Sequence, residues 1–282
     1  MPIIYINKIM KKVTEELIKS LLKMRISDSH KGDYGHALLI CGSKGMAGAA
    51  VLACGGALKS GCGLVTVHLP AHERAAIYSN FPSAMVEGEE KSFFTQLPYN
   101  LSKYNAIGIG CGLGQNLLTV AAFEDLLKQV KIPLVIDADA LNILSKNVDL
   151  QNFIPKNSIL TPHIGEFKRL VGGWQNDEEK IEKARNFTYE KQVFLLLKGA
   201  NTMIFSPKKE IFVNTTGNAG MAKGGSGDVL TGLITGLYAR GYSPKEAAII
   251  GAFFHGKAGD KATENFGFES YNSRDLIEFI RI

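Results

Sequence analysis

The sequence lacks the marks of a zinc-stapled, secreted or membrane-inserted chain. Its four cysteines, Cys41, Cys54, Cys62 and Cys111, show no CxxC spacing and no nearby histidine partner, which argues against a structural zinc site. No run of about 18 consecutive apolar residues could cross a bilayer. The start, MPIIYINKIMKK, has no apolar segment followed by a small-residue cleavage site. These absences predict a cytoplasmic chain without a membrane span.

A clustered basic stripe is also missing. The chain has 32 lysines and arginines against 27 aspartates and glutamates, a formal net charge of +5. The basic residues are dispersed, with only short pairs such as Lys11–Lys12 and Lys208–Lys209, so nucleic-acid binding is not expected. The mild positive excess is compatible with an enzyme that handles anionic small molecules.

Short apolar runs alternating with helix-like segments indicate an α/β fold. Buried strands are expected at 37–41, 64–67, 106–109, 134–136, 158–161 and 193–197, a pattern typical of a parallel sheet covered by helices on both faces. Segments 202–205 and 211–213 flank a turn-rich connection and predict an antiparallel hairpin at the sheet edge. Helices are expected at 47–59, 226–240, 244–263 and 273–281. Because no linker or repeat interrupts the chain, residues 1–282 are predicted to form a single domain.

Polar and glycine-rich segments follow the predicted strands, at 41–48, 108–114, 137–139, 161–166 and 198–202. Ligands of open α/β sheets bind beyond the carboxyl ends of the strands, so these segments predict one ligand site at that rim. Two familiar phosphate loops are excluded. The first segment lacks GxxxxGK[ST] spacing, and the GxGxGxG run at 108–114 contains no GxGxxG.

The strongest local signal is the run Gly224-Gly225-Ser226-Gly227-Asp228 at the start of a predicted helix. Its glycines can expose consecutive backbone N–H groups, and the helix start adds free amides, which together form a cradle for a phosphoryl group in transfer. Asp228 is placed to take a proton from an attacking hydroxyl, and the helix dipole is expected to keep it ionised. The alternative is that Ser226 or Asp228 simply caps the helix.

The run GMAKGGSGDVLTGLITGL resembles the anion-hole and catalytic-base segment of ribokinase-like enzymes, and it is most similar to the NAD(P)H-hydrate dehydratase branch. KGDYGHALLICGS, GAAVLACGGALKSGCGLVTV, DADALN, LTPHIGEF and KGANT resemble the same branch, and the resemblance extends from Lys31 to Gly256. It implies a ribokinase-like three-layer sandwich with a mostly parallel central sheet. It also implies ADP- or ATP-dependent dehydration of the S epimer of hydrated NADH and NADPH, with Mg²⁺, by a homotetramer. The nucleotide would phosphorylate the ring 6-hydroxyl, and loss of phosphate would restore the double bond.

The resemblance implies roles for the residues that match the family motifs. Asp228 would be the catalytic base, and the anion hole would span Gly225 to Gly227, with Gly227 also near the nucleotide. The remaining nucleotide contacts would be Lys198, Gly199, Ala200, Asn201 and Thr202. In this set Lys198 would supply charge and Thr202 a hydroxyl. The hydrated dinucleotide would contact Asp228, Ala49, Gly112 and His163, and the choice between Ala49 and Ala50 is open.

Two positions depart from related patterns. Vitamin and sugar kinases of this superfamily usually carry Asn-x-x-Glu where this chain, like the dehydratase branch, has His163-x-x-Glu166. Glu166 would hold Mg²⁺ through water, and His163 would contact substrate, with a purely structural histidine as the alternative. Cys111 stands where the family commonly has proline, so the turn loses the fixed φ of proline.

Competing interpretations remain at this level. Thirty residues precede Lys31, too few for the N-terminal epimerase domain of many family members, so epimerase activity is not expected. The main alternative is a small-molecule kinase of the same superfamily acting on a vitamin or sugar alcohol, because it would share the phosphoryl step. A nucleotide-binding regulator without catalysis is disfavoured by the presence of Asp228 and the glycine run.

Overall fold

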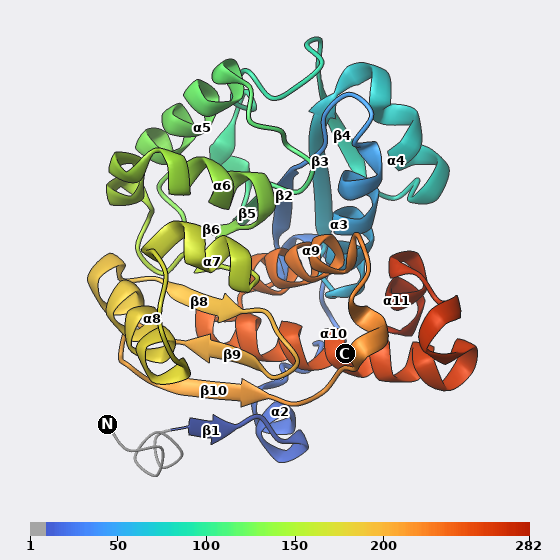
Figure 1. Cartoon of the computed structure of the whole chain (residues 1–282). Helices are drawn as coiled ribbons and strands as arrows, with labels where there is room; N and C mark the ends of the chain where they lie inside the picture. The colour runs from blue at the N-terminus through green and yellow to red at the C-terminus, as the bar shows by residue number, and fades with distance from the viewer. Residues whose placement is uncertain (1–9) are drawn as a thin grey trace.

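The computed structural model describes residues 10–282. Over this range the strands form one ten-stranded sheet in the order β1-β10-β9-β8-β7-β6-β5-β2-β3-β4 (Figure 1). The strands are β1 (Met10–Lys12), β2 (His36–Ile40), β3 (Leu64–Pro70), β4 (Met85–Glu89), β5 (Ala106–Ile109), β6 (Leu134–Ile136), β7 (Ile159–Leu160), β8 (Phe194–Leu197), β9 (Thr202–Phe205) and β10 (Ile211–Asn214). Neighbouring strands run parallel except the two pairs that include β9, which are antiparallel.

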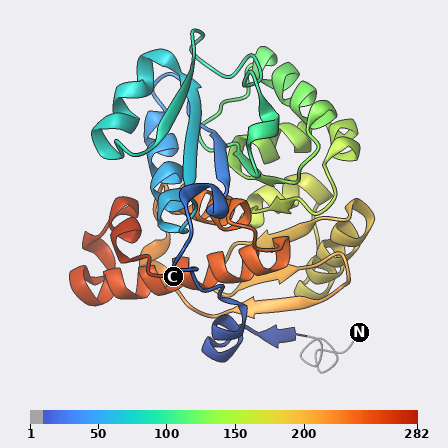
Figure 2. The ribbon, with the colours of Figure 1, turned by 180° about the vertical axis from the view of Figure 1, so that it is seen from behind.

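Helices cover both faces of this sheet. They are α2 (Glu15–Leu21), α3 (Ala47–Lys59), α4 (Arg74–Asn80), α5 (Leu117–Gln129), α6 (Ala138–Lys146), α7 (Ile164–Val171), α8 (Asp177–Lys191), α9 (Ser226–Ala239), α10 (Pro244–Ser270) and α11 (Ser273–Phe279). Helices α5 to α8 share one apolar core with alternate strand residues such as Leu38 and Leu195. Helices α9 and α10 share another core with the intervening residues, such as Val135 and Leu196. Figure 2, seen from behind, shows α10 in front of β8–β10.

The central strands explain why the apolar runs were readable from sequence. Every residue of β5, β6, β7 and β8 is buried, because both side-chain directions of a parallel strand meet a helix layer. The prediction of a mostly parallel sheet between helix layers is confirmed. No helix between residues 10 and 282 combines the length and apolar character needed to cross a bilayer.

The predicted hairpin is present as β9 and β10, paired from Phe205–Ile211 to Thr202–Asn214. Two strands were not predicted, β1 outside β10 and β4 at the other edge. Their sequences, MKK and MVEGE, contain no apolar run, and each gains its extended form from the neighbouring strand. Helix α10 runs to Ser270, past the predicted end at residue 263, with a turn at Gly267.

Helices α3 and α9 pack backbone against backbone. A Cβ added to Gly232 would lie 1.8 Å from the Ala53 carbonyl oxygen, and one added to Gly56 would lie 2.1 Å from the Val229 carbonyl oxygen. This close approach requires small residues on both helices. It holds the start of α9 beside α3, where Leu52 lies against Gly225.

Candidate active site

The carboxyl ends of β6, β7 and β8 border a cavity of about 820 Å³. Residues just beyond each strand line it: Asp137 after β6, His163 after β7 and Lys198 after β8. The start of α9, residues of the 214–223 segment and the α10 residues Ala252, His255 and Gly256 complete the lining. Residues from several of the polar and glycine-rich segments therefore lie together at the carboxyl ends of the strands, as the fold predicts.

The first turn of α9 has no side-chain cap. Gly225 occupies the N-cap position with φ 89°, a left-handed conformation that suits glycine. No side chain of the described residues accepts from the first-turn amides as a cap. The alternative in which Ser226 or Asp228 caps the helix is therefore wrong. The N–H groups of Gly227 and Asp228 are available to an anion in the cavity, whereas the Ser226 N–H donates to the Lys223 carbonyl oxygen at 3.4 Å.

Asp228 lies in this first turn and lines the cavity. Burial raises the pKa of its carboxyl to about 6, against a hydrogen bond with the Cys111 thiol that lowers the pKa. The negative charge of Asp137 adds to the rise. Desolvation of the carboxylate is the largest cause of this rise. A pKa near 6 leaves most of the group ionised at neutral pH and makes it a stronger base than an ordinary aspartate.

Lys198 is held by a buried carboxylate. Its Nζ lies 2.8 Å from Asp137 Oδ1 and 3.9 Å from Glu166 Oε2. The second oxygen of Asp137 accepts a 2.7 Å hydrogen bond from the Thr231 hydroxyl. Although burial opposes it, the charges of Asp137 and Glu166 raise the pKa of Lys198. The ammonium is therefore charged, and a Cβ added to Gly227 would lie 3.2 Å from it.

His163 and Glu166 form a capping box at the start of α7. His163 Nδ1 accepts from the N–H groups of Gly165 and Glu166 at 2.9 and 3.3 Å, and Glu166 Oε2 accepts from the His163 N–H at 2.8 Å. The structural interpretation of His163 is thus correct as far as the helix start is concerned. Its side chain is nevertheless 54% exposed and lines the cavity, so the same residue is also accessible to a ligand.

The other residues predicted to contact the nucleotide divide into two groups. Gly199, Ala200 and Thr202 line the cavity beside Lys198. Asn201 is exposed and is not part of the cavity wall, because the turn between β8 and β9 directs it to the surface.

Ala49 and Gly112 lie together outside the main cavity wall. A Cβ added to Gly112 would lie 2.8 Å from Ala49 Cβ, so the loop after β5 touches the start of α3. Ala49 is half-buried, whereas Ala50 is fully buried against Gly42. Of the two alanines that the sequence left open, Ala49 is therefore the one a ligand can reach. Cys111, the neighbour of Gly112, connects this pair to Asp228.

The sequence did not predict a role for Asp137 or His255. Asp137 directly follows a buried strand, a signal that was present in the sequence. His255 lies within the apolar face of α10, where a ligand-side histidine looks like any core residue. Its Nε2 lies 2.9 Å from the Ser226 carbonyl oxygen, and burial lowers its pKa to about 4. The ring is thus neutral and its Nε2–H donates to the first turn of α9.

The described residues contain no group of three or more His, Cys, Asp or Glu side chains arranged to hold a metal ion. The nearest carboxylates, Asp137 and Glu166, both neighbour Lys198. A divalent cation at this rim would therefore need phosphate oxygens and water as its other ligands, which is the usual coordination of Mg²⁺ beside nucleotides.

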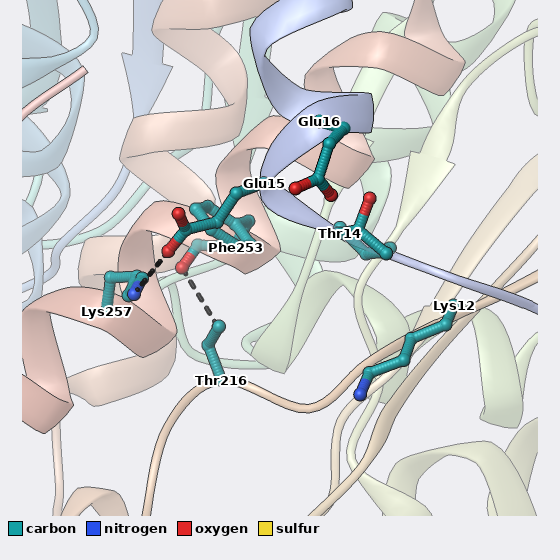
Figure 3. A pocket seen from close by; sticks show the side chains of 8 residues that line it. Lys12, Thr14, Glu15, Glu16, Thr216, Phe253 and Lys257 are labelled. Atoms are coloured by element: carbon teal, nitrogen blue, oxygen red, sulfur yellow. Dashed lines mark hydrogen bonds and ion pairs between the residues drawn. The ribbon is translucent and has the colours of Figure 1, made fainter.

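A second, shallower hollow of about 290 Å³ lies between β1, α2 and α10 (Figure 3). Two interactions join residues of its lining: Lys257 pairs with Glu15 at 2.9 Å, and the Thr216 hydroxyl donates to the Phe253 carbonyl oxygen at 3.0 Å. Thr216 also lines the large cavity, so the hollow lies behind one wall of it.

Comparison with known proteins agrees with this geometry. The family model described as NAD(P)H-hydrate dehydratase matches residues 37–281. The ADP-dependent (S)-NAD(P)H-hydrate dehydratase of Neisseria meningitidis serogroup B is 39% identical over 253 residues, covering 88% of this chain and 83% of that protein. The bifunctional NAD(P)H-hydrate repair enzyme of Moorella thermoacetica is 38% identical and covers 95% of this chain, but the chain spans only 52% of that protein.

Solved structures are also similar to this chain. The ADP/ATP-dependent NAD(P)H-hydrate dehydratase from Bacillus subtilis, co-crystallized with ATP/Mg²⁺, has a TM-score of 0.83 at 31% identity and covers 96% of both chains. Ribokinase from Thermotoga maritima has a TM-score of 0.58 at 12% identity, covering 87% of this chain and 99% of that one. The second likeness shows the ribokinase-like fold alone.

Proposed function

The chain belongs to the NAD(P)H-hydrate dehydratase family, and we propose that it dehydrates the S epimer of hydrated NADH and NADPH using ADP or ATP. The chain spans about half the length of the bifunctional relative, so the support for this activity comes from the residues of this chain's own cavity. The observation that carries the proposal is a single cavity lined by an uncapped helix start, the carboxyl of Asp228 and the ammonium of Lys198.

Asp228 would take the proton from the 6-hydroxyl of the hydrated nicotinamide ring. The hydroxyl oxygen then forms a bond to the terminal phosphorus of the nucleotide, and the bond from that phosphorus to the bridging oxygen breaks. ADP would leave as AMP, and ATP as ADP. Loss of the phosphate, together with a proton from the neighbouring ring carbon, restores the double bond.

Within the predicted anion hole from Gly225 to Gly227, the N–H groups of the two glycines would bind the negative charge of the phosphoryl group in transfer, together with the Lys198 ammonium. Preorganised donors of this kind contribute about 3 kcal/mol each to the transition state. Because His255 Nε2 donates to the Ser226 carbonyl oxygen, the turn that carries these amides is already held before a ligand binds.

Mg²⁺ would be held by the nucleotide phosphates, with Glu166 through water and Asp137 as the nearby carboxylates. When bound, the ion supplies charge neutralisation for the phosphates. The residues fit this arrangement, since one ammonium among the three carboxylates of Asp137, Glu166 and Asp228 leaves a net charge of −2 at the rim.

The two substrates would meet at Asp228. The nucleotide would lie against Lys198, Gly199, Ala200 and Thr202, with its base toward the 214–223 segment. The hydrated dinucleotide would contact His163 and the Ala49–Gly112 pair, which Cys111 connects to Asp228. Asn201 does not line the cavity and is not among the proposed nucleotide contacts.

The test is to incubate the protein with NADPH hydrate, Mg²⁺ and either ADP or ATP, and to follow recovery of the reduced-nicotinamide absorbance. We expect recovery together with one phosphate released per ring restored. Absence of recovery, with a stable phosphate ester formed from a vitamin or sugar alcohol, would refute the proposal in favour of the kinase alternative.

Three further expectations remain proposals: a homotetramer, which the family resemblance implies, and a cytoplasmic location and a single catalytic domain over residues 1–282, which the sequence predicts. Light scattering of the purified protein, cell fractionation and limited proteolysis test them in turn. A monomer, a membrane-associated fraction or two stable proteolytic halves would contradict them.

A further inference from the structure

The 217–225 segment, which leads into the anion-hole turn, is tied to the C-terminal helices at three points. Asp260 on α10 accepts from the Gly217 N–H and from Asn218 Nδ2, both at 3.0 Å. Lys223 Nζ donates to carbonyl oxygens beyond the turn in α10. The Ser273 hydroxyl, at the start of α11, donates to the Gly224 carbonyl oxygen at 2.7 Å. The segment is therefore held at its beginning, near its end and next to the N-cap of α9.

We propose that Asn218, Asp260 and Lys223 form a clamp that positions the anion-hole turn for the nucleotide. None of them is proposed to touch the reacting atoms, so they are positioning residues. The inference rests on the proposed function only in taking Gly225 to Gly227 as the anion hole.

Asn218 is the centre of the first tie. Its Oδ1 accepts from the Gly220 N–H at 3.0 Å, from the Thr263 hydroxyl at 3.0 Å and from the Tyr271 hydroxyl at 3.3 Å. Its Nδ2 meets the Asp260 carboxylate. All the donors therefore face the oxygen and the acceptor faces the nitrogen, which fixes the orientation of the amide. The side chain therefore joins the segment to α10 and to Tyr271.

Lys223 is the second tie. A lysine next to a phosphate cradle is expected to bind phosphate, but its Nζ donates to the carbonyl oxygens of Phe268, Glu269 and Tyr271 at 2.8, 3.1 and 2.6 Å. All three of its N–H groups are thus used. Its Nζ also lies 4.1 Å from the centre of the Tyr271 ring.

The turn in α10 makes this arrangement possible. Gly267 has φ 77°, which interrupts the helix. The chain after it presents the carbonyl groups of Phe268, Glu269 and Tyr271 to Lys223 Nζ. The positive charge of Lys223 therefore joins the segment to α10, and Lys198 remains the lysine directed at the phosphates.

The first experiment exchanges the partners of the Asn218–Asp260 tie. In Asp260→Asn two amide groups meet and one hydrogen bond is lost, so ADP affinity, measured by calorimetry, should fall about tenfold. Backbone amide exchange over 217–225 should accelerate by a similar factor. The double variant N218D/D260N restores an acceptor facing each donor, and it should recover most of both losses. Glu264→Gln is the matched control, because Glu264 lies on α10 but pairs only with exposed Lys261.

The second experiment separates a clamp from a phosphate ligand at Lys223. Lys223→Met should accelerate amide exchange over both 217–225 and 268–272, and it should weaken AMP and ADP binding by the same factor. A phosphate ligand would instead lower ADP affinity more than AMP affinity and leave exchange near Tyr271 unchanged, which would overturn the assignment. Should Asp260→Asn fail to fold, N218D/D260N and Lys223→Met still test the clamp.

Failure of the clamp and failure of the proposed function give different results. If Asp260→Asn and Lys223→Met both keep ADP affinity and exchange rates within twofold of the parent protein, the clamp is wrong, whatever reaction is catalysed. If the parent protein does not restore hydrated NADPH, the proposed function is wrong, while the exchange measurements still decide whether the clamp exists.

Discussion

Asp228→Asn should abolish turnover and at the same time stabilise the ligand-free protein. Burial raises the pKa of this carboxyl from 3.8 to about 6, a rise of about two units (6 − 3.8). One unit corresponds to about 1.4 kcal/mol, so ionisation in the folded state costs at most about 3 kcal/mol. Solvent screening at this partly exposed group reduces that cost to roughly 1–2 kcal/mol. A neutral amide side chain at this position does not carry this cost of ionisation.

The direction of the pH dependence follows from the sign of the shift. Below pH 3.8 the carboxyl is protonated in the folded and unfolded states alike, so the cost is absent and the variant has no advantage. Above pH 6 the carboxyl is ionised in both states and the full cost is present. The stability advantage of the variant should therefore grow between these values and stay constant at higher pH.

Thermal unfolding at several pH values, beside turnover, measures both effects. For a chain of this size 1 kcal/mol shifts the unfolding temperature by about 2–4 °C, so the variant should gain roughly 2–8 °C at pH 8 and little at pH 4. Turnover should fall by about 10²- to 10⁴-fold. Asp149→Asn, at an exposed position, is the control and should change neither. Near-normal turnover would remove Asp228 as the base, and an unchanged unfolding temperature at pH 8 would refute the burial argument.

Three further perturbations test the rest of the site. Lys198→Met leaves the Asp137 carboxylate buried without its partner, so the free energy of unfolding should fall by about 3 kcal/mol; adding Asp137→Asn should recover stability in denaturant titrations but not ADP affinity. Gly227→Ala adds a methyl group 3.2 Å from Lys198 Nζ, so kcat/KM should fall about tenfold or more. The unfolding midpoint should stay nearly unchanged, and a normal kcat/KM would contradict the anion-hole assignment. His255, whose pKa is lowered from 6.5 to about 4, destabilises the fold as pH falls through this interval; His255→Gln should therefore lose less stability between pH 7 and pH 4.5 than the parent protein, and parallel pH curves would refute this.

Much of the fold was readable because burial leaves a local record. The strands β5, β6 and β8 are apolar at every position, since a parallel strand between two helix layers has no solvated face. The strands β1 and β4 leave no such record, because MKK and MVEGE are polar segments that become strands only beside β10 and β3. The predicted end of α10 at residue 263 lies close to the interruption at Gly267. The short helical segment that follows is held by contacts with Lys223 from elsewhere in the chain.

The Gly224–Asp228 run illustrates what the sequence predicts by itself and what depends on the tertiary structure. By itself the sequence determined that this glycine-rich run stands at a helix start, and that His163, Glu166 and Lys198 follow apolar strands, because these patterns are local properties. The anion cradle is a prediction from the same run. Only the tertiary structure decided that Lys198 pairs with Asp137, that His163 also caps a helix and that Lys223 Nζ binds carbonyl groups beyond Gly267. It also decided that the pKa of Asp228 rises. Each of these depends on which groups distant in sequence share a buried volume, and Coulomb and desolvation energies change steeply over those few ångströms.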